Sequence, residues 1–120
     1  MTDYIYHITS HASWAAAQSS GIYKADSLMK EGFIHCSKAG QILRVANNYY
    51  LDQPGLVILM IDPAMLKAGL RWEPGSDKVD ELFPHIHSPL NLDAVARVFD
   101  FLPGRDGKFH LPPDIGMISN

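Results

Sequence analysis

The sequence predicts an α+β fold with a mainly antiparallel sheet, and three observations support this prediction. Helical signals concentrate in the first half of the chain, while short runs rich in β-branched and aromatic residues recur along its whole length. Turn residues separate those runs. At 120 residues the chain is long enough to bury a core of its own, so we expect a single domain over residues 1–120.

The first half of the chain is expected to alternate between strands and helices. Ser10 is a suitable N-cap for the first helix, Gly21 is suited to its end, and Ser37 is placed to cap a later, longer helix. The expected elements, in order, are a strand over residues 3–9, a helix over 11–20, a short helical turn over 27–32, a strand over 33–37, and a helix over 38–51 with a buried face at Ile42, Val45, Ala46 and Tyr49.

The second half reads mainly as strands. The run "LVILMID" predicts a central strand buried on both faces, and "DAVARVFDFLP" fits either a strand or a helix. We favour the strand, because "GRDG" can then form a hairpin into "KFHLP". The expected elements are strands over residues 56–62, 70–73, 82–88 and 93–103, with a single helical turn over 63–69 and a turn over 74–78.

Composition and charge exclude several classes of protein. The formal net charge is −3 and the ten basic residues are scattered, so we expect no broad nucleic-acid surface. The longest apolar run is too short for a membrane span, and the N-terminus lacks a secretory leader. A single cysteine excludes an internal disulfide and is typical of a reducing compartment, so we expect a cytoplasmic protein.

Histidines recur in three separate, otherwise apolar segments, and strand alternation indicates how they are oriented. Residues two apart in a strand share a face, so His7 lies with Thr9, and His85 lies with His87. His35 shares its face with Phe33 in the same way. The sequence therefore predicts that imidazoles distant along the chain converge on one site for a small ligand.

The histidine-containing segments could form three kinds of site. A metal site could use the His85–His87 pair with His35, Cys36 or Glu73, but no Cys-x-x-Cys or His-Glu-x-x-His motif supports it, and we expect no metal. Cys36 could be a nucleophile, although His35 points to the opposite strand face, and a lone buried cysteine is more often an inert small hydrophobe.

A nucleotide or ribose pocket is the third kind of site, and it is the one we favour. Tyr49 could form an aromatic wall, and Glu73 could stabilise a positive, sugar-like transition state. Arg71 shares a strand face with Glu73 and could hold a phosphate or pair with that carboxylate. The alternatives are that Glu73 is a solvated residue before Pro74, and that His7 and His35 are core histidines bonded to backbone carbonyls.

Six motifs follow one another from about residue 4 to residue 112: "IYHIT", "GFIHCS", "QILRVANNYY", "LVILMID", "LRWE" and "FPHIHSPLNLDAVARV". In this order they resemble a family of bacterial and plant proteins labelled domain of unknown function 952. The resemblance implies an ADP-ribosyltransferase-like fold, which is a split, strongly bent sheet with flanking helices.

In ADP-ribosyltransferases a histidine on the first strand, often within His-x-Thr, binds a ribose of NAD. His7 and Thr9 match that pattern, and "IHCS" looks like the second motif, in which His35 and Ser37 would orient the other ribose. A late glutamate completes such sites, and Glu73 is the nearest candidate, although "FPHIHS" has histidines where a glutamate is expected.

The resemblance thus implies a protein that binds NAD or a related nucleotide and cleaves or transfers at the nicotinamide–ribose bond. Two alternatives stay open, a non-catalytic binding module and a metal-dependent hydrolase that uses His85 and His87. The catalytic candidates are Glu73 and His35, and the ligand-binding candidates are His7, Thr9, Ser37, Tyr49, Arg71, His85 and His87.

Overall fold

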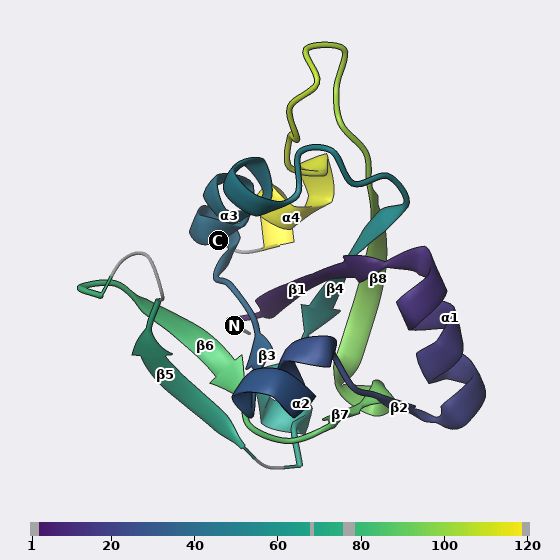
Figure 1. Ribbon diagram of the computed structural model, residues 1–120, viewed down its shortest axis with the longest axis vertical. Helices are drawn as coiled ribbons and strands as arrows, with labels where there is room; N and C mark the ends of the chain where they lie inside the picture. The colour runs from purple at the N-terminus through teal and green to yellow at the C-terminus, as the bar shows by residue number, and fades with distance from the viewer. Residues whose placement is uncertain (1–2, 68, 76–78, 119–120) are drawn as a thin grey trace.

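The computed structural model describes residues 3–67, 69–75 and 79–118, with the side chains of residues 116–118 left undescribed. Its strands form two three-stranded antiparallel sheets and one two-stranded ribbon (Figure 1). The strands are β1 (Ile5–Ser10), β2 (Ile22–Tyr23), β3 (Ile34–His35), β4 (Leu56–Ile61), β5 (Leu70–Pro74), β6 (Leu82–Ile86), β7 (Leu90–Asn91) and β8 (Val95–Phe101). The helices are α1 (His11–Ser20), α2 (Asp26–Glu31), α3 (Ile42–Tyr49) and α4 (Pro113–Ile118), with 3₁₀ turns over Ala39–Gln41, Pro63–Met65 and Leu92–Ala94.

The central sheet has the order β1-β4-β8 and is covered on both faces. Every residue of β4 is buried, as the sequence predicts for a strand in the middle of a covered sheet. Alternate β4 residues enter two different apolar clusters. Leu56, Ile58 and Met60 pack with α3 and Ile115, whereas Val57, Leu59 and Ile61 pack toward α1 and the other strands.

The second sheet has the order β3-β6-β5 and leaves the central sheet at an angle (Figure 1). One backbone bridge joins the two sheets: the Tyr6 N–H donates to the Ser37 carbonyl at 2.8 Å, and the Ser37 N–H donates to the Tyr6 carbonyl at 2.8 Å. One face of this sheet buries Ile34 and Ile86 in the core. The prediction of a mainly antiparallel α+β fold is confirmed.

The helix boundaries confirm most of the predicted signals. The Ser10 side chain accepts a hydrogen bond from the Ser13 N–H at 3.0 Å at the start of α1, and Gly21 follows the helix at φ 86°. The prediction for Ser37 is wrong, because the 3₁₀ turn before α3 begins after Lys38, whose N–H donates to the Gln41 side chain at 2.9 Å.

Several other boundaries differ from the predictions. The α3 helix is shorter than expected and Tyr49 is 54% exposed, although Ile42 and Ala46 of the predicted face are fully buried. Residues 33–37 form a strand only at β3, because the chain then turns to make the bridge at Ser37. The expected segments over residues 63–69 and 74–78 extend partly outside the described residues.

The strand interpretation of the last third is confirmed by β8, which pairs with β4 along its length. The hairpin that follows is held by the Gly104 N–H, which donates to the Lys108 carbonyl at 2.7 Å. Its second arm forms a single bridge between Pro103 and Phe109 rather than a strand. The Asn47 side chain accepts the Phe109 N–H at 2.9 Å, so this arm docks on α3 instead of pairing further with β8.

Candidate functional site

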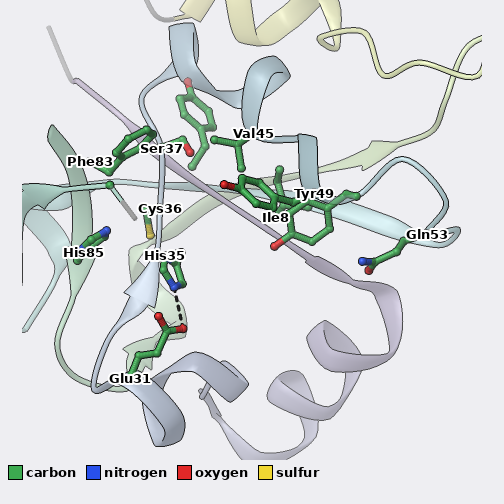
Figure 2. Close-up of a pocket in the computed structure, with 13 residues that line it drawn as sticks. Ile8, Glu31, His35, Cys36, Ser37, Val45, Tyr49, Gln53, Phe83 and His85 are labelled. Carbon is green, nitrogen blue, oxygen red and sulfur yellow. Dashed lines mark hydrogen bonds and ion pairs between the residues drawn. The ribbon is translucent and has the colours of Figure 1, made fainter. Parts of the chain in front are cut away.

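Two adjoining cavities lie between the central sheet, the second sheet and α3, and Figure 2 shows the larger one. The larger, which we call the aromatic cavity, has a volume of about 420 Å³ and is lined by Tyr6, Tyr49, Tyr50 and Phe83 together with two imidazoles. The smaller, which we call the hydroxyl cavity, has a volume of about 270 Å³ and is lined by Thr9, Ser10, Ser13, Tyr23 and Ser27. Ile8, His35, Tyr50 and Gln53 line both cavities, so the two form one cleft.

His7 is buried at the floor of the hydroxyl cavity, and both of its ring nitrogens are engaged by the protein. Nδ1 donates to the His35 backbone carbonyl at 2.6 Å, because a carbonyl can only accept. In a neutral ring Nε2 must then accept, and it lies 2.7 Å from the Tyr23 hydroxyl. The Tyr23 oxygen lies 2.9 Å from Thr9 Oγ1, and since its own proton goes to His7, Thr9 supplies the proton of that contact.

This network keeps His7 uncharged. Burial, the main cause, lowers the pKa of His7 to about 4 and outweighs the carbonyl acceptor, which favours the protonated ring. Burial likewise raises the pKa of Tyr23 to about 12, although its contact with Thr9 acts in the opposite sense. Of the sequence alternatives for His7, the core histidine bonded to a backbone carbonyl matches this geometry, even though the ring edges the cavity.

His35 occupies the junction of the two cavities. Its side chain is 44% exposed, and its Nε2 lies 3.0 Å from Oε2 of Glu31, four residues earlier in the chain (Figure 2). Because Glu31 ends α2 and His35 ends β3, this pair spans the turn between the two elements. A carboxylate hydrogen-bonded to one ring nitrogen fixes the tautomer of an imidazole, and His35 therefore presents a set orientation to the cleft.

The face of the second sheet opposite Ile34 and Ile86 carries a cluster of aromatic and titratable side chains. The His85 ring stacks on Phe33 with centroids 4.1 Å apart, and the His35 and His87 rings contact Phe33 at 4.8 and 5.3 Å. Glu73 Oε1 accepts hydrogen bonds from His85 Nδ1 at 2.9 Å and from His87 Nε2 at 2.6 Å. The predicted face-sharing of His85 with His87, and of His35 with Phe33, is confirmed.

The electrostatics of this cluster favour a charged Glu73 beside a neutral His85. The hydrogen bonds from His87 and then His85 hold the pKa of Glu73 below its ordinary value. Burial lowers the pKa of His85, and this outweighs the opposing hydrogen bond to Glu73. A neutral His85 that donates from Nδ1 keeps a lone pair on Nε2, so this ring can accept a proton or a hydrogen bond at the aromatic cavity.

The remaining sequence candidates divide according to their position relative to the cleft. Ser37 and Tyr49 line the aromatic cavity, and Thr9 lines the hydroxyl cavity. Glu73, His87 and Arg71 line neither cavity. Arg71 is exposed on β5, and within the described part of the chain its guanidinium does not pair with Glu73, whose bonds go to the two histidines.

Cys36 lines the aromatic cavity, but the thiol is buried. Burial raises the pKa of Cys36 far above its ordinary range, which keeps the thiol protonated and poorly nucleophilic. The interpretation of this residue as an inert small hydrophobe fits its position in the apolar cluster beneath β3.

Several residues that line the cleft were not predicted from the sequence, and three of them show what signal was available. Glu31 is near His35 in sequence, and its i,i+4 spacing from a histidine was the signal that could have revealed it. Tyr23 belongs to a two-residue strand whose pairing with β7 carries no local signature. Gln53 follows α3 in a turn and lines both cavities, and nothing in the residues around it indicates that position.

The chain belongs to a family of proteins of unknown function, DUF952, whose model matches residues 8–98. A search of curated proteins finds no match. The structure is similar to the crystal structure of protein CC0527 from Caulobacter crescentus, with 31% sequence identity, a TM-score of 0.83, and coverage of 94% of this chain and 98% of that one. The solution NMR structure of CC0527 gives 30% identity, a TM-score of 0.80, and coverage of 96% and 98%.

These matches confirm the predicted family, and the names of the matched structures state no activity. The ADP-ribosyltransferase-like character of the fold therefore stays a prediction. Among the residues that the structure describes, no helix is long and apolar enough to cross a membrane.

Proposed function

We propose that the cleft binds a nucleotide-class ligand, with the base in the aromatic cavity and the ribose and phosphate in the hydroxyl cavity. The observation that carries this proposal is the chemical contrast between two cavities that share a junction at His35. One part of the ligand must be flat and apolar, and the other must be rich in hydrogen-bonding oxygens. Nucleotides combine these two parts within one small molecule.

The aromatic cavity suits a base because aromatic side chains stack on π-faces and each stack contributes about 1–3 kcal/mol. Tyr49 and Tyr50 follow one another at the end of α3, and Phe83 of β6 lines the same cavity. Figure 2 labels Tyr49 and Phe83 among the residues around this space. The imidazoles of His35 and His85 add hydrogen-bonding groups at the edge of the same space. A stacked base would therefore contact aromatic side chains on its face and hydrogen-bonding imidazoles at its edge.

The hydroxyl cavity suits ribose and phosphate because its lining offers donors and one cation. Lys24 lies beside the hydroxyl groups of Thr9 and Ser13, and Ser10 caps a ten-residue helix whose first turn contains no acidic side chain. The positive end of the helix dipole and the Lys24 ammonium favour an anion, although the N–H groups of His11 and Ser13 already bond to the Gly55 carbonyl and the Ser10 side chain. Asp26 also lines this cavity, and its negative charge offsets that of Lys24, so an anion must bind on the Lys24 side.

A calorimetric titration against NAD, ADP-ribose, AMP and adenosine tests the proposal. We expect binding by at least one of these ligands, weakened about tenfold by His35→Ala, which corresponds to about 1.4 kcal/mol. The matched control is His110→Ala, which removes another exposed histidine with an i,i+4 carboxylate partner, Asp106, away from the cleft. Absence of binding by all four ligands would overturn the proposal, as would equal affinity of His35→Ala and the native chain.

A catalytic version of this function has a specific observation in its favour, the position of Glu31. Cleavage at a nicotinamide–ribose bond calls for a carboxylate near the forming cation. Among the residues described, Glu31 is the carboxylate that lines the aromatic cavity, whereas Glu73 is bonded to His85 and His87 outside it. We infer that, if the bond of NAD is cleaved here, Glu31 stabilises the cation and His35 orients the ribose.

Release of nicotinamide from NAD measures this activity directly. Glu31→Gln should abolish release while leaving NAD binding in place, and Glu73→Gln should leave release largely intact. Binding without any release by the native chain would reduce the function to a binding module. Loss of release in Glu73→Gln, with retention in Glu31→Gln, would restore the assignment made from the sequence.

A further inference from the structure

We propose that Glu73, His85 and His87 form a binding site for one divalent transition-metal ion of the zinc class. One ligand atom from each side chain lies within 4.8 Å of the other two. Two imidazole nitrogens and one carboxylate oxygen are a ligand set that binds zinc, and three protein ligands leave a coordination position open. The inference is independent of nucleotide binding in the cleft.

The sheet places these three side chains by register. In the antiparallel pairing of β5 with β6, Arg71 lies opposite His85 and Glu73 lies opposite Phe83, so Glu73 and His85 are diagonal neighbours on one face. His87 follows His85 by two residues and stays on that face, and its N–H donates to the Gly69 carbonyl at 2.7 Å. Backbone pairing on two strands thus sets the spacing of the three ligands.

The present contacts are close to those of a metal site. The two nitrogens lie 2.9 and 2.6 Å from the same carboxylate oxygen, whereas ligands of a tetrahedral zinc at about 2.0–2.1 Å lie roughly 3.3 Å apart. Each nitrogen–oxygen distance must therefore lengthen by a few tenths of an ångström, while the two nitrogens, which lie within 4.8 Å of one another, must approach each other by up to about 1.5 Å. Rotation of the two imidazole side chains can supply these displacements with the strands left in place.

Metal binding requires a change of tautomer in both rings. His85 Nδ1 and His87 Nε2 now donate protons to Glu73, and a metal needs their lone pairs. In neutral rings each proton moves to the other nitrogen, so His85 would carry it on Nε2 at the edge of the aromatic cavity. The metal therefore changes that nitrogen from an acceptor into a donor.

The surroundings support a defined site rather than a loose surface pair. His85 is buried, and its ring stacks on Phe33 at a centroid distance of 4.1 Å and an interplanar angle of 15°. The same Phe33 ring contacts His87 at 5.3 Å. Packing of this kind limits the rotation of ligand side chains, and a restrained ligand loses less freedom when it binds.

The test is a titration of the untagged, chelator-treated chain with Zn²⁺, and with Co²⁺ as a spectroscopic probe. We expect one Zn²⁺ per chain, and visible Co²⁺ absorption typical of four or five ligands. Glu73→Gln and His87→Ala should each weaken binding at least tenfold. Asp106→Asn, which breaks the exposed pair of Asp106 with His110 away from this sheet, should leave the affinity unchanged.

A second measurement does not depend on variants. In imidazole ¹⁵N spectra of the native chain, Zn²⁺ should shift the His85 Nδ1 and His87 Nε2 resonances and leave those of His7 in place. No stoichiometric Zn²⁺ binding would overturn the proposal. Binding that shifts other histidines, or that persists in both Glu73→Gln and His87→Ala, would overturn it as well.

Discussion

The two three-stranded sheets use histidine in opposite ways, although both are antiparallel and nearly equal in width. The central sheet is covered on both faces, and His7 on β1 directs both ring nitrogens to partners inside the protein. The second sheet packs Ile34 and Ile86 into the core, and its other face holds the buried His85 and the partly exposed His87 around Glu73. His7 and His85 are about equally buried, so what separates a structural imidazole from one available to a ligand is the number of its ring nitrogens bonded within the described part of the chain.

The largest expected effect comes from the central strand of the doubly covered sheet. Leu59 is fully buried in β4, so Leu59→Ala should lower the free energy of unfolding by about 2–5 kcal/mol through lost burial and the cavity that remains. Urea unfolding measures this change, and Val98→Ala on the neighbouring strand is the control, because Val98 is 40% exposed. Equal losses for the two variants would contradict the assignment of β4 as the buried centre of the sheet.

The next effect concerns the partner of His7. Tyr23→Phe removes the hydroxyl that donates to His7 Nε2, and a buried nitrogen left without a partner costs about 1–3 kcal/mol of folding free energy. The control is Tyr4→Phe, because Tyr4 is half-buried and its hydroxyl makes no hydrogen bond within the described residues. If Tyr23→Phe is as stable as the native chain, the network around His7 is not what holds this ring.

A pH dependence of similar size follows from the same ring. The folded state holds the pKa of His7 at about 4, below its ordinary value of 6.5, so between these pH values the unfolded chain binds a proton that the folded chain does not. The free energy of unfolding should therefore fall as the pH drops from 6.5 toward 4, by at most about 1.4 kcal/mol per pH unit. The lowered pKa of His85 also makes the free energy of unfolding fall with falling pH. The lowered pKa of Glu73 has the same effect, but mainly below the ordinary carboxyl pKa of 4.5.

Urea unfolding across this pH range measures the slope, and His7→Asn should reduce it while His110→Ala should not. A slope that is identical in the native chain and in His7→Asn would show that other groups cause the acid sensitivity.

The smallest expected effect lies at the junction of the cavities. Glu31 and His35 are both about half exposed, so Glu31→Gln should change the free energy of unfolding by less than about 0.5 kcal/mol. Asp106→Asn, which breaks the comparable exposed pair with His110, should give a similarly small change. A thermal melt measures both, and a loss well above this size in Glu31→Gln would mean that the pair serves the fold more than the cleft.

Strand alternation alone indicated how His85, His87 and Phe33 are oriented, because a strand side chain has only two faces to choose from. The full burial of β4 was equally readable, since an unbroken apolar run needs cover on both sides. The sequence did not predict which residues, distant from one another along the chain, would be in contact. The bond from Tyr23 to His7 depends on where a two-residue strand docks, and the 3₁₀ turn at Ala39–Gln41 depends on the bridge between Tyr6 and Ser37.

The same limit explains the candidate site. The sequence paired Glu73 with Arg71 or with a ligand, and its actual partners lie on β6, where only the register of two strands brings them close. The helix α4 was missed, although Pro113 at its first position was an available signal.

The most direct test of the contrast between the two sheets is an imidazole ¹⁵N titration of the native chain with NAD and AMP. Ligand in the cleft should shift the ring resonances of His35 and His85, which line the aromatic cavity, while those of the remote His110 stay constant. Shifts confined to His110, or no shift at any ring, would contradict the claim that the face of the second sheet that carries His85 borders the ligand site.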